Sequence, residues 1–177
     1  MRKTNVKRML GTALLLGTMA VATACGSGEE ANTTDTLQAT QETEASATVE
    51  VDIEAAATTL SQNVTFADTM TRVQDAVAGV TILKSSEDTK VVLYQGNGEL
   101  ADEILIMEAV DETVAAAELA VAQQHVTDKK DSFQDYHPEQ AQKAGKAIVV
   151  QKGKYVIVCI TDDVDNAKTQ IDNLFAE

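Results

Sequence analysis

The sequence predicts an α+β fold for residues 51–177, with an antiparallel sheet of about four strands in two hairpins and amphipathic helices packed on one face. The strand-like runs VVLYQ and ILIMEAV are separated by GNGELADE, in which Gly96 and Gly98 are typical turn residues. A second pair of runs, KAIVVQ and YVIVCIT, flanks Lys152-Gly153-Lys154. Helical spacing of apolar residues around these runs indicates one domain with a single core.

The longest predicted helix follows Asp111, which is a suitable capping residue. The apolar residues expected on its buried face are Ala115, Leu119, Ala122, Val126 and Phe133. Glu118, Asp128 and Lys129 are expected outside that face. Pro138 suits the first position of a short helical turn after it.

Two further helices are predicted at the ends of the domain. The first begins near Ile53 and stops near Asn63, because its apolar residues recur three or four positions apart. The last follows Asp162 or Asp163. Between the first helix and the first strand, VTFADTM and DAVAGVTIL fit a short strand, a short helix or a packed loop. We expect Phe66 and Met70 to be buried there.

The N-terminus has the pattern of a secretory signal. Residues 1–8 carry four basic side chains and no acid, and the next sixteen residues are uncharged. That apolar stretch is short for a membrane span, which needs about 20 residues. The exit Ala22-Thr23-Ala24-Cys25 resembles the bacterial lipobox, in which the cysteine receives a diacylglycerol. We therefore expect residues 1–24 to be removed and Cys25 to be lipidated; an ordinary signal peptide that leaves Cys25 unmodified is the alternative.

Residues 25–50 are predicted to form a lipidated cysteine followed by a disordered acidic tether. From Gly26 to Glu50 the chain contains one Leu, one Val, no aromatic residue and no Lys or Arg. Such a segment buries too little apolar surface to offset its conformational entropy. It would let the domain stand clear of a membrane.

The charge balance limits the classes of partner. Removal of residues 1–24 would leave 10 Lys and Arg against 28 Asp and Glu, a formal charge of −18. Nucleic acids and anionic lipid headgroups both need basic contacts, so neither is an expected partner. Membrane attachment would come from the lipid. The acidity serves either solubility or a cationic partner.

Residue patterns typical of catalysis are scarce, so the sequence predicts no enzyme, no cofactor and no metal. His125 and His137 lack the spacing of zinc-binding motifs, and no nucleophile elbow or phosphate-binding loop is present. Cys159 lies within an apolar strand-like run, where a free cysteine behaves as a buried hydrophobe.

One region resembles a known family. The runs KKDSFQDYHPEQ and KGKYVIVCITDD are similar to a family of Gram-positive bacterial lipoproteins known only as a domain of unknown function. The matching positions are Phe133, Asp135, Tyr136, Pro138, Glu139, Gly153, Tyr155, Val156, Asp162 and Asp163. The resemblance covers roughly residues 51–177 and the lipobox, but Glu99 and Leu100 depart from the small residues of the family. It implies an envelope location and no particular reaction.

Tyr136 has two interpretations. It is either a structural clasp at a helix exit or part of an interaction surface formed by Lys129, Lys130, Tyr136 and His137. The leading functional hypothesis is a membrane-anchored, extracytoplasmic lipoprotein whose domain binds another protein or an envelope component without catalysis. The alternatives are a small-molecule or ion-binding accessory of a transporter and an unrecognised hydrolase.

Overall fold

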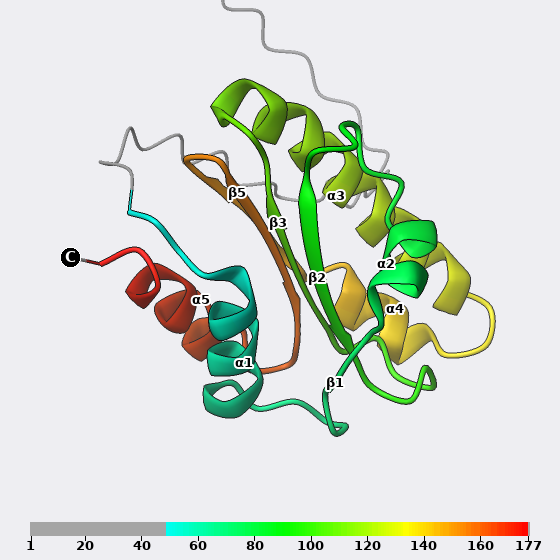
Figure 1. Ribbon diagram of the computed structural model, residues 1–177. Coiled ribbons are helices and arrows are strands. Elements are labelled where there is room, and N and C mark those ends of the chain that lie inside the picture. Colours follow the sequence, from blue (N-terminus) through cyan, green and yellow to red (C-terminus); the bar gives the residue numbers. More distant parts are fainter. Residues whose placement is uncertain (1–48, 177) are drawn as a thin grey trace, which may run out of the picture. The chain divides into compact units, whose positions relative to one another are not determined.

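The computed structural model describes residues 49–176, so the predicted signal peptide, Cys25 and all but the last two residues of the predicted tether lie outside the described residues. Figure 1 shows the arrangement of the elements. In chain order they are α1 (Ile53–Asn63), β1 (Thr71–Arg72), α2 (Asp75–Thr81), β2 (Lys90–Gln95), β3 (Glu103–Glu108), α3 (Glu112–Phe133), α4 (Pro138–Ala144), β4 (Ile148–Lys152), β5 (Tyr155–Ile160) and α5 (Val164–Asn173).

The strands form one five-stranded antiparallel sheet in the order β1-β2-β3-β5-β4. This confirms the predicted α+β class and both hairpins. The β2–β3 and β4–β5 hairpins join through β3 and β5, where Leu105 lies opposite Val158. The additional strand that the sequence did not predict is β1. It has two residues and pairs with the outer edge of β2.

Helices cover both faces of the sheet, and not the one face that the sequence predicted. Ile104 of β3 and Ile157 of β5 pack in a core with α1 and α5. Leu105 and Val158, the next residues along each strand, pack in a second core with α2, α3 and α4. Figure 1 shows α1 and α5 on the opposite side of the sheet from α3. The reason is the continuous apolar sequence of β3 and β5, which makes both faces of these central strands apolar.

Local signals set the ends of several elements. Asp52 accepts hydrogen bonds from the first turn of α1, and the Asp111 carboxylate accepts one from the Val114 N–H, as expected for the cap of α3. Pro138 is the first residue of α4. Gly153 has φ +56° in the β4–β5 turn, a conformation that favours glycine. Asp163 precedes α5, but its carboxylate accepts hydrogen bonds from the backbone N–H of Thr65 and the side chain of Asn166.

The segment between α1 and β2, for which the sequence fits a strand, a helix or a loop, contains the short strand β1 and the short helix α2. Helix α2 packs on the sheet through Ala78 and the following Ile82, both of which are buried. Phe66 and Met70 pack against the α1 side of the core, but they are partly buried and not fully buried as the sequence predicts.

Glu118 of α3 is fully buried, which corrects the expectation that it lies outside the buried face. Its carboxylate accepts hydrogen bonds from the backbone N–H groups of Ser85 and Ser86 at 2.9 and 3.0 Å and from the Thr89 hydroxyl at 2.7 Å. Burial would raise the pKa of Glu118, but these donors outweigh it and lower the pKa. Glu118 therefore fastens the loop between α2 and β2 to α3.

Within residues 49–176, none of the helices is both long enough and apolar enough to cross a membrane.

We expect Glu118→Ala to destabilise the domain by about 3 kcal/mol or more, because three donors lose their buried acceptor. Urea denaturation of the purified protein measures the change. Asp128→Ala is the matched control on the same helix. Asp128 is exposed and accepts a hydrogen bond from Gln124 of that helix, so its effect should be below about 0.5 kcal/mol. Equal losses in the two variants would contradict the anchoring role of Glu118.

Candidate functional site

A buried carboxylate lies at the start of β3, on the side of the sheet that α3 covers. The side chain of Glu103 is 0% exposed, and it binds three donors from other elements. Its Oε1 lies 2.7 Å from His125 Nε2, and its Oε2 lies 2.5 Å from Lys129 Nζ and 2.7 Å from Gln95 Nε2. Burial alone would raise the pKa of Glu103, but the hydrogen bond from His125 and the charge of Lys129 outweigh it and hold the pKa at about 2.

This pKa gives the cluster a defined pH dependence. Because the folded-state pKa lies below the ordinary value of 4.5, ionised Glu103 contributes stability that is present above pH 4.5. That contribution is lost as the pH falls through about 2. The cluster therefore stabilises the domain throughout the neutral range.

A second ion pair lies beside the first. Lys143 of α4 has a side chain that is 4% exposed, and its Nζ lies 3.2 Å from the buried Asp102 and 2.9 Å from Asp162, which follows β5. Burial would lower the pKa of Lys143, but Asp162 and Asp102 outweigh it and raise the pKa. Gln140 of the same helix accepts a hydrogen bond from the backbone N–H of Ala101 at 3.0 Å. These contacts fix α4 to the end of the sheet.

Each carboxylate of these two clusters lies next to a lysine. A carboxylate that orients a histidine is also found in catalytic triads, where the histidine activates a nucleophile. Here the carboxylate of Glu103 is shared between His125 and Lys129, and the pairs fasten α3 and α4 to the strands. Among residues 49–176, no three His, Cys, Asp or Glu side chains are placed to hold a metal ion. The arrangement supports a structural role.

The four residues of the predicted interaction surface do not form one surface. Lys129 faces the interior, where its 14% exposed side chain pairs with Glu103, because the helix turns it toward the sheet. Lys130 is partly buried. His137 is exposed and lies 3.4 Å from Glu139. Tyr136 is 83% exposed, so the interpretation of its side chain as a structural clasp is wrong.

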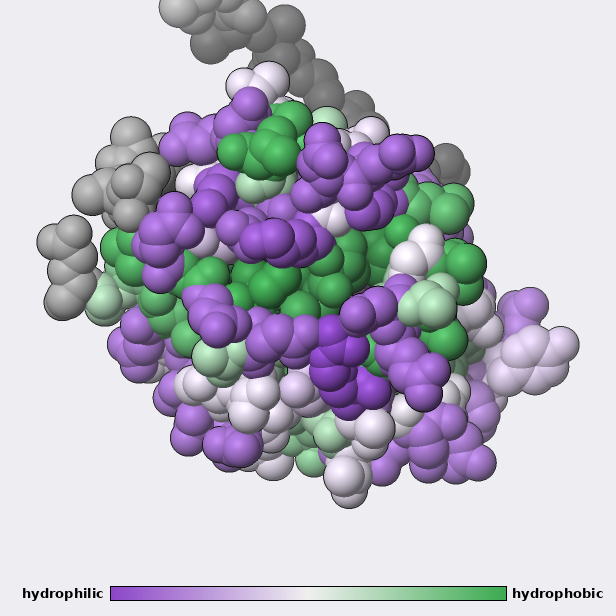
Figure 2. Space-filling model, in the orientation of Figure 1, coloured by the Kyte–Doolittle hydropathy of each residue, from purple (hydrophilic) through white to green (hydrophobic). Residues whose placement is uncertain are grey.

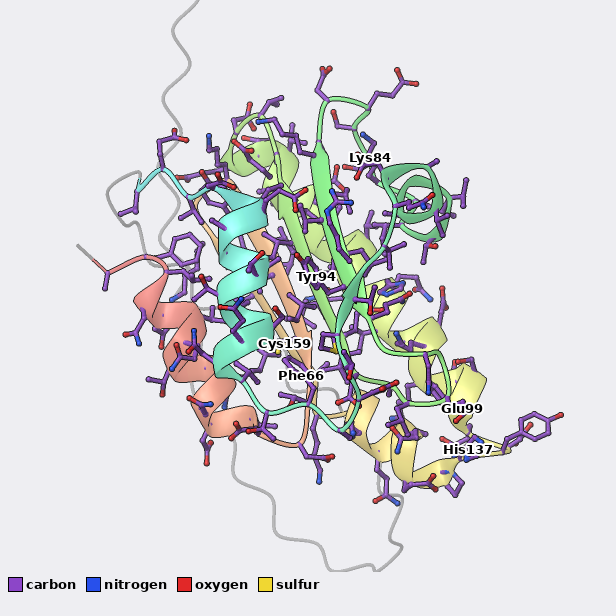
Figure 3. The ribbon with its side chains drawn as sticks, turned by 60° about the horizontal axis from the view of Figure 1, so that its bottom comes forward. Phe66, Lys84, Tyr94, Glu99, His137 and Cys159 are labelled. Atoms are coloured by element: carbon purple, nitrogen blue, oxygen red, sulfur yellow. The ribbon has the colours of Figure 1, made fainter. Side chains whose placement is uncertain are left out.

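Cys159 is buried, as the sequence predicts. Burial, with a smaller contribution from Asp102, raises the pKa of its thiol to about 12. The thiol therefore stays protonated at neutral pH and packs as an apolar side chain of β5. Figure 3 shows Cys159 among the strands, whereas the labelled His137 lies at the periphery of the domain.

Residues 83–161 match the family described as a domain of unknown function (DUF4358). The matched segment contains β2 to β5, α3 and α4, and with them every member of the two buried ion clusters except Asp162. No curated protein and no solved structure gives a match.

An apolar stripe lies on the outer side of α2, outside the matched domain except for its last residue. Val77, Val80 and Leu83 are 49%, 74% and 78% exposed. They are spaced three residues apart, which places them along one side of the helix and its exit. Figure 2 shows apolar side chains over α2 at the right of the view. Sequence reasoning missed this stripe, because apolar residues at helical spacing predict burial.

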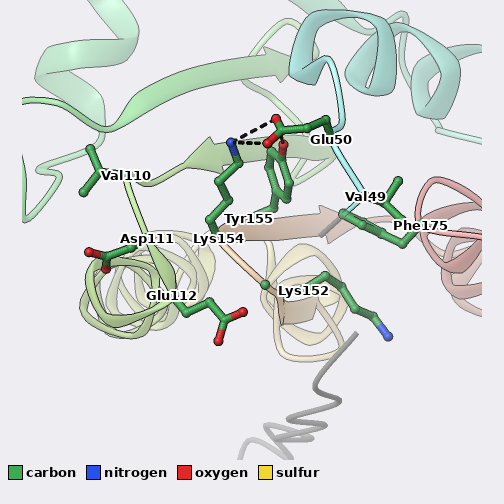
Figure 4. Close-up of a pocket in the computed structure, with 10 residues that line it drawn as sticks. Val49, Glu50, Val110, Asp111, Glu112, Lys152, Lys154, Tyr155 and Phe175 are labelled. Carbon is green, nitrogen blue, oxygen red and sulfur yellow. Dashed lines mark hydrogen bonds and ion pairs between the residues drawn. The ribbon is translucent and has the colours of Figure 1, made fainter. Parts of the chain in front are cut away.

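A cavity of about 260 Å³ lies at the end of the sheet that holds the β4–β5 turn. Its lining residues come from the two chain ends of the described part, the start of α3 and the turn itself. They are Val49, Glu50, Val110, Asp111, Glu112, Lys152, Gly153, Lys154, Tyr155 and Phe175 (Figure 4). Residues from four separate regions form this cavity, so sequence spacing could not predict it.

We expect Lys129→Met to destabilise the domain by about 3 kcal/mol, because Glu103 would keep its charge and lose its buried cationic partner. Thermal and urea denaturation at neutral pH measure the loss. Lys168→Met, at an exposed position of α5, is the matched control and should change stability by less than about 0.5 kcal/mol. A neutral effect of Lys129→Met would show that the cluster does not stabilise the fold.

Proposed function

We propose that this protein is an extracytoplasmic lipoprotein, held to the membrane by a diacylglycerol on Cys25, whose domain binds another envelope protein without catalysis. The basic N-terminus, the uncharged stretch and Ala22-Thr23-Ala24-Cys25 support the lipid attachment. Two acyl chains give stable attachment where one is marginal. The acidic segment after Cys25 would space the domain from the membrane.

The exposed stripe on α2 is the observation that carries the binding role. Helix α2 packs on the sheet through two buried side chains, those of Ala78 and Ile82. Val77, Val80 and Leu83 are exposed to solvent. Single exposed apolar side chains are common, whereas several on one short element mark an interaction surface. Burial of apolar surface is the dominant favourable term in most protein–protein association.

The polar residues around the stripe indicate the chemistry of the partner. Asp75 at the start of α2 pairs with Arg72 at 2.7 Å and is 81% exposed. Glu87 and Asp88 in the following loop are exposed and add negative charge. Lys84 donates hydrogen bonds to the backbone carbonyls of Glu87 and Thr89, so its charge is held within the loop. A protein surface with an apolar centre and a basic rim would complement this region.

The lipid attachment is tested by Cys25→Ala. We expect the parent to incorporate a fatty-acid analogue during growth and the variant to incorporate none, because the thiol is the acceptor. Gel fluorescence of the captured protein measures the label, and Cys159→Ala, which removes a buried thiol, is the control that should keep it. Equal labelling of Cys25→Ala and the parent would contradict the lipoprotein assignment.

The binding role is tested by in-cell crosslinking and capture of the tagged protein. We expect Val80→Glu with Leu83→Glu to lower the yield of captured partner by about tenfold or more, because charge enters the apolar centre of the interface. Ala117→Glu, at an exposed position of α3, is the control that should keep the yield. Tyr136→Glu tests the surface predicted from the sequence, and its yield of captured partner is compared with that of the α2 variant. Loss of the partner in Tyr136→Glu alone would place the interface there and contradict the role of α2.

A further inference from the structure

The cavity beside the β4–β5 turn combines an apolar wall with a bound carboxylate. Val110 is 57% exposed at one side, and Phe175 packs against the Tyr155 ring with centroids 5.7 Å apart at the other. The volume of about 260 Å³ lies just below the roughly 300–1,000 Å³ of pockets that hold drug-sized ligands. The space therefore suits a smaller ligand.

The carboxylate at this cavity belongs to Glu50. Lys154 Nζ donates to both Glu50 oxygens, at 3.2 and 3.0 Å, and the Tyr155 hydroxyl donates to Oε2 at 3.3 Å. The same hydroxyl accepts a hydrogen bond from the Val51 N–H at 2.9 Å, which fixes its orientation. Figure 4 shows the cation and the hydroxyl converging on the Glu50 carboxylate. Together they form a receptor for one carboxylate.

Glu50 is suited to exchange with another carboxylate. Its side chain is 75% exposed, and exposed ion pairs contribute little stability. Lys154 keeps a second partner, because its Nζ lies 3.0 Å from Glu108 Oε1, whose side chain is only 15% exposed. Glu108 and Glu50 both raise the pKa of Lys154, so this side chain stays charged at neutral pH. Lys154 would remain in position when Glu50 leaves.

The charges on the other side of the cavity limit the ligand further. Asp111 and Glu112, at the start of α3, line it there, whereas the charge of the lining residue Lys152 is paired with Asp172 at 3.4 Å. A second negative group at the far end of a ligand would meet these carboxylates and be repelled. Only one end of a ligand can therefore be anionic, and the remainder must be apolar to contact Val110 and Phe175.

We propose that this cavity binds a small monocarboxylate with a short apolar chain, whose carboxylate replaces that of Glu50 on Lys154 and Tyr155. The ligand site is separate from the stripe on α2, since no residue of α2 lines the cavity. Its test is therefore independent of the proposed protein partner.

Hexanoate is the probe, because it has one carboxylate and a chain of suitable length. We expect hexanoate to shift the backbone amide signals of Gly153, Lys154 and Tyr155 in NMR spectra of the ¹⁵N-labelled full chain. The dissociation constant should be on the order of 1 mM, given the few atoms of the ligand. Hexanol, which lacks the charge, and adipate, which adds a second carboxylate, should each bind at least about fivefold more weakly.

Three variants separate the proposed site from non-specific binding. Glu50→Ala removes the competing carboxylate at an exposed position and should tighten hexanoate binding by about threefold or more. Lys154→Met keeps the aliphatic stem and the backbone bond from Ala109 N–H to the Lys154 carbonyl, and it should abolish the shifts. Lys168→Met, far along α5 from the turn, should leave them unchanged. The dispersion of each spectrum reports whether the variant is folded.

Two outcomes would overturn the proposal. One is the absence of shifts at these amides with 20 mM hexanoate, about twentyfold above the expected dissociation constant, in both the parent and Glu50→Ala. The other is equal binding of hexanoate and hexanol, which would leave an apolar cavity without carboxylate recognition. If Lys154→Met does not fold, Glu50→Ala still tests the proposal. Weaker or unchanged hexanoate binding in Glu50→Ala would show that the ligand does not replace the Glu50 carboxylate.

Discussion

The pairing of β3 with β5 is the constraint on which the rest of the domain depends. Each of these strands belongs to a different hairpin, and their six paired positions join the hairpins into one sheet. Both strands are apolar on both faces, so neither face can remain in solvent. The helices that surround them are the consequence: α1 and α5 cover one face, and α3 and α4 cover the other.

The polar groups at the start of β3 follow from this burial. Glu103 and Asp102 lie where the sheet passes under α3 and α4, and a carboxylate there must find cationic or hydrogen-bonding partners. His125 and Lys129 reach Glu103 from α3, and Lys143 reaches Asp102 from α4. No polar side-chain atom that is buried in residues 49–176 lacks a hydrogen-bond partner. The ion clusters thus fix the positions of two helices, and surfaces elsewhere remain for binding.

Those surfaces lie on elements that the central strands do not require. Helix α2 packs through two buried residues and presents its other side to solvent. The cavity lies beside the β4–β5 turn, next to the first and last described residues of the chain. The matched segment supplies β2 to β5, α3 and α4, whereas all of α1, α2 and α5 lie outside it. The segments outside the match therefore contribute Val77 and Val80 to the stripe on α2, and Val49, Glu50 and Phe175 to the cavity.

The sequence by itself determined the α+β class, both hairpins, the cap of α3 at Asp111 and the burial of Cys159. These features depend on local spacing and turn residues, which a short window of sequence contains. Tertiary structure decided the covering of both sheet faces, the burial of Glu118 and Lys129, and the exposure of Tyr136 and of the stripe on α2. Each of these depends on a partner far along the chain: Glu118 meets Ser85 and Thr89, and Lys129 meets Glu103. Periodicity identifies which residues share one side of a helix, but it contains no information about the donor or carboxylate that another element places opposite them.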